Sequence, residues 1–140
     1  MSRDAWAAIA ATVAVAVVVI LGFRVLGGPA NQRLVQADLR TVRALAELAR
    51  QINQRWATGA RPLPANLDKL PSAAKQDPVS GKPFIYRAKS NEEYELCATF
   101  ATDGRDARAT APMDRWLHPK GEFCFQFQAS EQVPFVPYNY

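Results

Sequence analysis

The sequence is poor in the residues from which catalytic and metal sites are usually built. It has one histidine, His118, and two cysteines, Cys97 and Cys124. These do not complete the four ligands of a structural zinc site. The cysteines are far apart and lack the C-x-x-C spacing of redox-active pairs, and the glycine-rich nucleotide-binding signatures are missing. The sequence therefore predicts a protein that is not an enzyme and has no cofactor, no metal and no catalytic residues.

Two segments contain residues that could belong to a catalytic site or a calcium-binding loop. His118 lies in Trp116-Leu117-His118-Pro119, where no serine or cysteine motif accompanies it. This favours a loop histidine over a catalytic one. Asp103-Gly104-Arg105-Asp106 has two acids but lacks EF-hand spacing, and an arginine separates them. We interpret this segment as a surface turn.

Positive charge is present but not concentrated. The formal net charge is +4 and the pI is about 9.3. Basic and acidic residues are interleaved, as in RTVRALAELARQINQR, a pattern that is typical of a solvated surface. We therefore expect no nucleic-acid partner.

A long apolar run, Ala5 to Phe23, contains no charged residue and is flanked by Asp4 and Arg24. At ~1.5 Å per helical residue it can cross a hydrocarbon layer of ~30 Å. Its many valines are mediocre helix formers in water, but in lipid the backbone must satisfy its own hydrogen bonds. The run predicts one transmembrane helix and a single-pass protein in a lipid bilayer.

A cleaved signal peptide is the alternative interpretation of this run. Its apolar core is longer than the ~7–15 residues of a typical signal peptide, Arg24 follows directly, and no A-x-A-like cleavage site precedes a suitable mature start. These features favour an uncleaved signal anchor.

The two signals for membrane orientation conflict. Arg3 precedes the span, whereas Arg24 and Arg33 follow it, which by the positive-inside rule puts the rest of the chain in the cytoplasm. Cys97 and Cys124, each in a strand-like run, instead favour an oxidising compartment. We expect an inner-membrane (cell-membrane) protein with its head in the periplasm or another extracytoplasmic space.

A second helix is predicted after Gly27-Gly28-Pro29, a tripeptide that interrupts helices and is interpreted as a hinge. Asn31 is a suitable N-cap, and Gly59 with Arg61-Pro62 ends the helix. Between them, apolar residues recur at spacings of three and four: Val35, Leu39, Val42, Leu45, Leu48, Ala49, Ile52 and Trp56. The opposite face carries Arg33, Asp38, Arg40, Arg43, Glu47 and Arg50.

Such an amphipathic helix most often packs on a sheet, and the chain offers strands for this. A coiled coil is the alternative, but the pattern lasts for fewer than about four heptads. Strands are predicted at Phe84–Arg87, Tyr94–Phe100 and Glu122–Gln128, after an irregular connector held by Leu63, Leu67 and Leu70. The predicted fold class is α+β: a transmembrane helix, then a long amphipathic helix packed on a small antiparallel sheet. Residues 1–28 form the anchor and hinge, 29–131 the globular head and 132–140 an extended tail.

The alternation of side chains along each strand predicts which residues share a face of the sheet. Leu96, Ala98 and Phe100 share one face, and we expect the helix residues Leu39, Val42, Leu45, Leu48 and Ile52 to pack on it. Cys97 and Cys124 lie on the opposite face of their strands. If the two strands are neighbours, these cysteines form a cross-strand disulfide.

The head resembles that of type II secretion pseudopilins and related type IV pilin-like proteins. The residues that carry the resemblance are Leu63, Pro64, Leu67, Asp77, Pro78, Gly81, Pro83, Phe84 and Tyr86. The match covers about half of the chain, residues 31–100, and implies a helix followed by a small antiparallel sheet; in that family a C-terminal loop can bind calcium. The family's processing signal, glycine followed by Phe-Thr-Leu-x-Glu, is absent, so the resemblance does not imply assembly into a filament.

The C-terminal segment QVPFVPYNY combines two prolines with aromatic residues. Prolines favour an extended path, and aromatic side chains are enriched among interface anchors, so Phe135, Tyr138 and Tyr140 are candidate partner-binding residues. Folding back onto the head is the alternative. The predicted function is that of an accessory or scaffold subunit of a larger membrane complex, such as a secretion, pilus-like, respiratory or photosynthetic assembly. A pseudopilin or minor pilin is the alternative.

Overall fold

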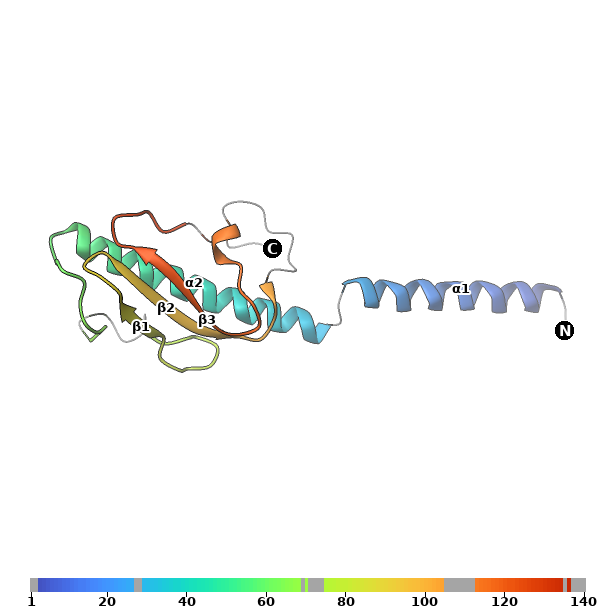
Figure 1. The fold of residues 1–140 in the computed structure, drawn as a ribbon. Helices are drawn as coiled ribbons and strands as arrows, with labels where there is room; N and C mark the ends of the chain where they lie inside the picture. Colours follow the sequence, from blue (N-terminus) through green and yellow to red (C-terminus); the bar gives the residue numbers. More distant parts are fainter. Residues whose placement is uncertain are drawn as a thin grey trace. The chain divides into compact units, whose positions relative to one another are not determined.

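The computed structural model describes residues 3–26, 29–68, 70, 75–104, 113–134 and 136. Its elements are α1 (Arg3–Leu26), α2 (Pro29–Ala57), β1 (Ile85–Ala88), β2 (Glu93–Phe100), the short 3-10 helix η3 (Met113–Trp116) and β3 (Gly121–Gln128) (Figure 1). The chain divides into two compact units, Met1–Arg33 and Leu34–Tyr140. We call the second unit the head. The α+β class predicted from the sequence is confirmed.

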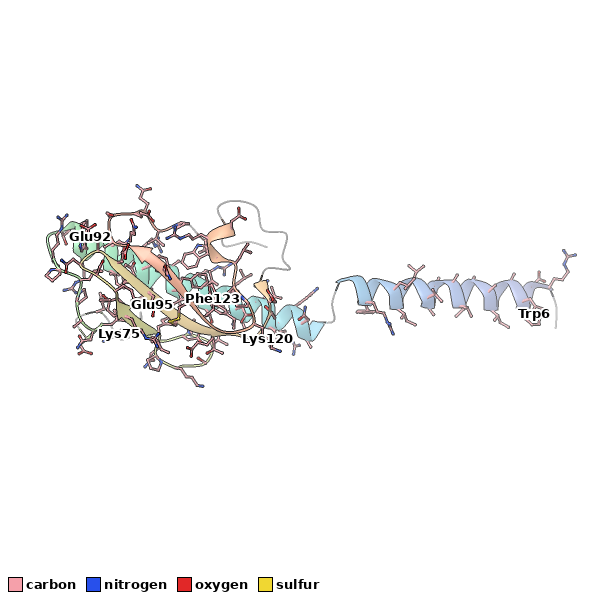
Figure 2. All side chains as sticks on the ribbon, in the orientation of Figure 1. Trp6, Lys75, Glu92, Glu95, Lys120 and Phe123 are labelled. Carbon is pink, nitrogen blue, oxygen red and sulfur yellow. A yellow bond between two sulfur atoms is a disulfide. The ribbon has the colours of Figure 1, made fainter. Side chains whose placement is uncertain are left out.

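The first helix, α1, is apolar on all sides and leaves its side chains exposed. The stretch Arg3–Arg24 has a mean hydropathy of 2.5, and none of its most apolar window is buried. Trp6 is 63% exposed and projects from the helix (Figure 2). This helix is long and apolar enough to cross a membrane, and the same properties also fit a signal sequence.

The second helix, α2, buries one stripe and exposes the rest. It begins at Pro29, two residues before the predicted N-cap Asn31, because proline in the first turn removes no intrahelical hydrogen bond. Its stripe is buried from Val42 to Trp56, whereas Leu34 and Val35 near its start are exposed. The predicted stripe is therefore correct in its central and C-terminal parts and wrong at Val35, which no strand covers.

The three strands form one antiparallel sheet in the order β1-β2-β3, which lies along α2 (Figure 1). Leu96 of β2 stands opposite Tyr86 of β1 and Phe125 of β3, so that side chains of all three strands share the face toward α2. Each strand begins and ends within about one residue of its predicted limits.

A single cluster of apolar side chains joins the sheet to α2. Leu45, Leu48 and Leu96 have no exposed surface, and Leu39 packs against the cluster from the side. The helix residues expected to cover the Leu96 face do so. Core members include Val42, Leu45, Leu48, Ile52, Leu96, Ala98, Phe100, Phe125 and Phe127.

Buried polar side chains of α2 hold loops against this core. Asp38, predicted on the solvent face, is 5% exposed and accepts hydrogen bonds from the backbone N–H groups of Ala101 and Thr102 at 2.9 and 2.7 Å. That prediction is wrong because the carboxylate caps the end of a strand, and its hydrogen bonds to backbone N–H groups offset the cost of burying it. Thr41 likewise donates a 2.7 Å hydrogen bond to Asp77 in the connector.

Candidate functional site

The two predicted cysteines form a disulfide in the middle of the sheet. Cys97 of β2 stands directly opposite Cys124 of β3, and their sulfur atoms are 2.06 Å apart. The bond ties the outer strand β3 to the central strand on the face away from α2. The predicted pairing is confirmed.

Next to the disulfide lies Glu95, the residue labelled at the middle of the sheet in Figure 2. An oxygen of its carboxylate and the two cysteine sulfur atoms lie within 4.8 Å of one another, a distance that suits a metal ion. The disulfide, however, uses both thiolates, and Glu95 is held by ion pairs with Arg87 (3.0 Å) and Lys89 (3.1 Å). In the disulfide form these residues therefore stabilise the sheet instead of offering a metal site.

His118 is buried, although the sequence indicated an ordinary loop residue. Its ring stacks on Phe100 at a centroid distance of 3.8 Å, and its backbone carbonyl accepts a 2.9 Å hydrogen bond from Gly104. A Cβ atom at Gly104 would lie 2.9 Å from His118 Nε2, so only glycine allows this approach. Burial lowers the pKa of His118, although the carboxylates of Asp38 and Asp103 oppose the shift. A neutral, packed imidazole that closes one end of the core follows from this geometry.

The remaining sequence candidates lie partly or wholly outside the described residues. Arg105 and Asp106 of the predicted surface turn are outside them. So are Phe135, Tyr138 and Tyr140, for which partner binding stays a prediction. The described part of the same segment lies on the head itself, because Val136 is 6% exposed and Val133 packs against the core.

Two of the hollows on the head carry charges of both signs. One, of about 580 Å³, is lined in part by Lys89, Glu93, Arg115 and Glu131. Another, of about 270 Å³, includes Arg50 and Glu47, which form an ion pair with each other. The larger hollow has equal numbers of basic and acidic side chains, whereas the smaller one also contains Arg43 beside the Arg50–Glu47 pair.

A third hollow, of about 230 Å³, differs from these two in its chemistry. Its apolar lining comes from Ile52, Trp56, Pro62, Pro64 and Leu70, and its charged residues are Arg55 and Arg61. No aspartate or glutamate is among its lining residues in the described part of the chain. We call this hollow the Trp56 pocket; it combines an apolar lining with the side chains of Arg55 and Arg61.

The end of α2 builds this pocket. Gly59 has a φ of 100°, and the N–H groups of Gly59 and Ala60 donate to the carbonyls of Trp56 and Arg55 at 3.2 and 3.1 Å. This is the Schellman pattern of helix termination, in which a left-handed glycine turns the chain back over the last helical turn. The reversal brings Arg61 over Trp56.

The contact between Arg61 and Trp56 shapes the charged side of the pocket. The guanidinium carbon lies 3.8 Å from the centre of the indole ring. A guanidinium over an aromatic ring is held by the ring quadrupole, while its in-plane N–H groups still point outward and can donate to a carboxylate. Arg61 is thereby held over Trp56.

Sequence reasoning missed this pocket because each of its parts had another explanation. Trp56 was counted as a core residue, and Gly59 with Arg61-Pro62 as a helix stop. Both readings are correct, since Trp56 is 9% exposed and the helix ends at Ala57. The available signal was the short spacing in the sequence between Trp56 and Arg61. A helix that ends at a glycine turns the residues just beyond it back toward its last turn.

Comparison with known proteins identified no relative of the chain. No protein-family model, curated protein or solved structure matches the chain.

Proposed function

We propose that the protein is a non-enzymatic single-pass membrane protein whose head serves as an accessory or scaffold subunit of a larger membrane complex. The observation that carries the proposal is α1, a helix with exposed apolar side chains all round, attached to a head that has its own core. A helix of this kind needs an apolar environment, and none of its most apolar window is buried.

The way polar side chains of α2 are used supports a binding role for the head. Asp38 caps the end of β2, Thr41 holds the connector through Asp77, and Asn53 donates to the carbonyls of Gln128 and Glu131 at 3.2 and 2.7 Å. These groups fix loops and turns, and a fixed surface suits recognition of a protein partner because little entropy is lost on binding.

The disulfide supports a location of the head outside the cytoplasm. Disulfides persist in oxidising compartments and are rare in reducing ones. We therefore place the anchor in the cell membrane and the head on its extracytoplasmic side.

A pseudopilin or minor pilin is the second candidate. The observation in its favour is the packing of the 29-residue α2 on an antiparallel sheet, the arrangement that the sequence resemblance implies. The two functions differ in processing, because a pseudopilin is cleaved before its apolar helix and a permanent anchor is not.

Alkaline extraction of membranes followed by intact-mass measurement tests the proposal. We expect the protein to stay in the membrane pellet until detergent is added and its mass to include α1. Loss of α1 by cleavage after it would show a secreted head, and cleavage just before the apolar helix would favour the pseudopilin. Protease added outside intact spheroplasts should digest the head, whereas protection would place it in the cytoplasm.

A subunit must also have a fixed neighbour. Photo-crosslinking amino acids at exposed positions around the head should give the same discrete crosslinked partner in intact membranes from one or more adjacent positions. Diffuse crosslinking from every position would contradict a subunit role.

A further inference from the structure

We propose that Glu95, Cys97 and Cys124 form a site for a thiophilic divalent cation of the Zn²⁺ type, which the disulfide closes and a dithiol reductant opens. The same residues then hold either a covalent bond or a metal ion between β2 and β3. Such a site goes beyond the proposed function and does not depend on it. Three features support it: the register of the strands, the distances between the ligand atoms and the charges around them.

The register of the sheet brings the three ligand groups together. Cys97 stands opposite Cys124, and Glu95 precedes Cys97 by two residues, so all three side chains leave the same face of the sheet. A carboxylate oxygen and the two sulfur atoms lie within 4.8 Å of one another. Ligand atoms of a tetrahedral Zn²⁺ site, with Zn–S of ~2.3 Å and Zn–O of ~2.0–2.2 Å, are ~3.4–3.8 Å apart. Once the S–S bond is broken, rotation about the Cα–Cβ bonds can give these separations while the strands stay paired.

The donor set selects the class of ion. Thiolates prefer Zn²⁺ and other soft or borderline ions, whereas Mg²⁺ and Ca²⁺ prefer oxygen ligands. Two thiolates and one carboxylate make three protein ligands. The fourth position of a tetrahedral ion is then open to water.

The charges around the cluster allow the ion to replace the disulfide. Hydrogen bonds from Lys89 and Arg87 lower the pKa of Glu95, so this ligand is already ionised. A divalent ion held by two thiolates adds no net charge, so the two basic side chains face the same total charge in both forms. Carboxylates that bind metals are commonly hydrogen-bonded to a further residue. The pairing with Arg87 and Lys89 therefore orients Glu95 and leaves it able to bind the ion.

The opening of the site is a two-electron exchange. A dithiol reductant attacks the sulfur of Cys124, which is partly buried, whereas Cys97 is only 1% exposed. The S–S bond breaks, both cysteines become thiols, and the reductant leaves as its own disulfide, having given up two electrons and two protons. Binding of the ion then releases the two thiol protons to water.

Spectroscopic titration of the full chain in nonionic detergent tests the proposal with Co²⁺, a coloured substitute for Zn²⁺. The protein is reduced with dithiothreitol, separated from the reductant under argon and titrated. We expect thiolate-to-cobalt charge-transfer absorption and the visible bands of a tetrahedral ion, which saturate at one ion per chain and disappear when Zn²⁺ is added. The disulfide form should show neither absorption, because its sulfur atoms are not thiolates.

Two variants assign the carboxylate ligand. Glu95→Gln should weaken Zn²⁺ binding to the reduced protein by ~ten-fold or more, measured by competition with a chromogenic chelator. Glu122→Gln is the matched control and should bind Zn²⁺ as before, because Glu122 lies on the same strand and face as Cys124 but outside the cluster. The melting temperature of each disulfide form checks the fold. If Glu95→Gln does not fold, the two redox forms of the unaltered protein decide.

Metal binding should also restore the link between β2 and β3. Reduction should lower the melting temperature of the head, because the disulfide no longer constrains the unfolded chain. Zn²⁺ should raise it again in the reduced protein, since the ion binds the folded site, and Mg²⁺ should not.

Three results would overturn the proposal. Absence of charge-transfer absorption in the reduced protein would show that the thiols bind no ion. Equal Zn²⁺ affinity of the reduced and disulfide forms would place the ion elsewhere. Unchanged affinity in Glu95→Gln, or an equal loss in Glu95→Gln and Glu122→Gln, would remove Glu95 from the ligands. The scaffold proposal stands or falls separately, by membrane extraction and crosslinking.

Discussion

The two helices have similar lengths, 24 and 29 residues, but opposite relations to the rest of the chain. On α1 the apolar residues surround the axis and stay exposed, Val18 by 68%. On α2 they follow one stripe, where Leu45 has no exposed surface. The same backbone geometry thus serves a helix that depends on its environment and a helix that depends on the sheet of its own chain.

The contrast teaches where the stability of the molecule resides. Apolar side chains stabilise a fold only when folding removes them from water, so those of α2 contribute to the head and those of α1 do not. Substitutions in the two helices, and in the bonds that connect α2 to the sheet, separate these contributions. Each is measured as the free energy of unfolding of the head in detergent.

The largest effect is expected for Leu45→Ala. Removal of this fully buried side chain leaves a cavity between α2 and the sheet, at a cost of ~2–5 kcal/mol in the free energy of unfolding. Leu34→Ala is the matched control on the same helix, because Leu34 is 46% exposed and should change stability by less than ~0.5 kcal/mol. Equal effects would show that the stripe faces something other than the sheet. Urea unfolding monitored by near-UV circular dichroism provides the measurement.

Removal of the disulfide should have the next largest effect. The double variant Cys97→Ala/Cys124→Ala frees the chain between the strands in the unfolded state, and the expected loss is ~2–4 kcal/mol. The native protein without reductant should react with no thiol reagent before or after unfolding. Labelling of both cysteines after unfolding would refute the bond and weaken the assignment of the head to an oxidising compartment.

Asp38→Ala tests the polar attachment of α2 to the end of β2. The substitution leaves the N–H groups of Ala101 and Thr102 without their acceptor, which should cost ~1–3 kcal/mol. Asp68→Ala, at an exposed position, is the control and should change little. If the two variants are equally stable, the cap contributes nothing and the apolar stripe alone holds α2.

A smaller loss of stability, caused by protonation of Asp77, should be measurable only at acidic pH. Burial opposes ionisation of Asp77, but hydrogen bonds from Ser80, Thr41 and the N–H of Val79 outweigh it and hold its pKa below the ordinary 3.8. The lowered pKa stabilises the head above pH 3.8, and this contribution is lost as the pH falls below that value toward the folded pKa. Thr41→Val should flatten the decline. A pH series of melting temperatures that is identical in both proteins would disprove the role of Thr41.

The smallest effect belongs to α1. Val18→Ala should leave the unfolding of the head unchanged within ~0.5 kcal/mol, because this valine is 68% exposed. A destabilised head would mean that α1 and the head unfold together, and the distinction between the two helices would fail.

The fold was largely predictable because the spacing of apolar residues along the sequence indicates its helices and strands. Three-and-four spacing identified α2, alternation identified the faces of β2 and β3, and the face opposite the core identified the disulfide. Asp38 was assigned to the wrong face because the donors to its carboxylate, the N–H groups of Ala101 and Thr102, lie some sixty residues away in the sequence. The Trp56 pocket escaped for a similar reason, since a hollow is defined by a chain reversal that no periodic pattern records.

The position of the pocket at the C-terminal end of α2 has a mechanical consequence. The chain enters this helix directly after the segment that follows α1, and 29 residues at ~1.5 Å each separate that entry from the last turn by about 43 Å. A pull transmitted from the start of α2 to its last turn would therefore run along one helix, parallel to its hydrogen bonds. The strands and their disulfide lie beside this line of tension, so the sheet would brace the loaded helix without carrying the load in series.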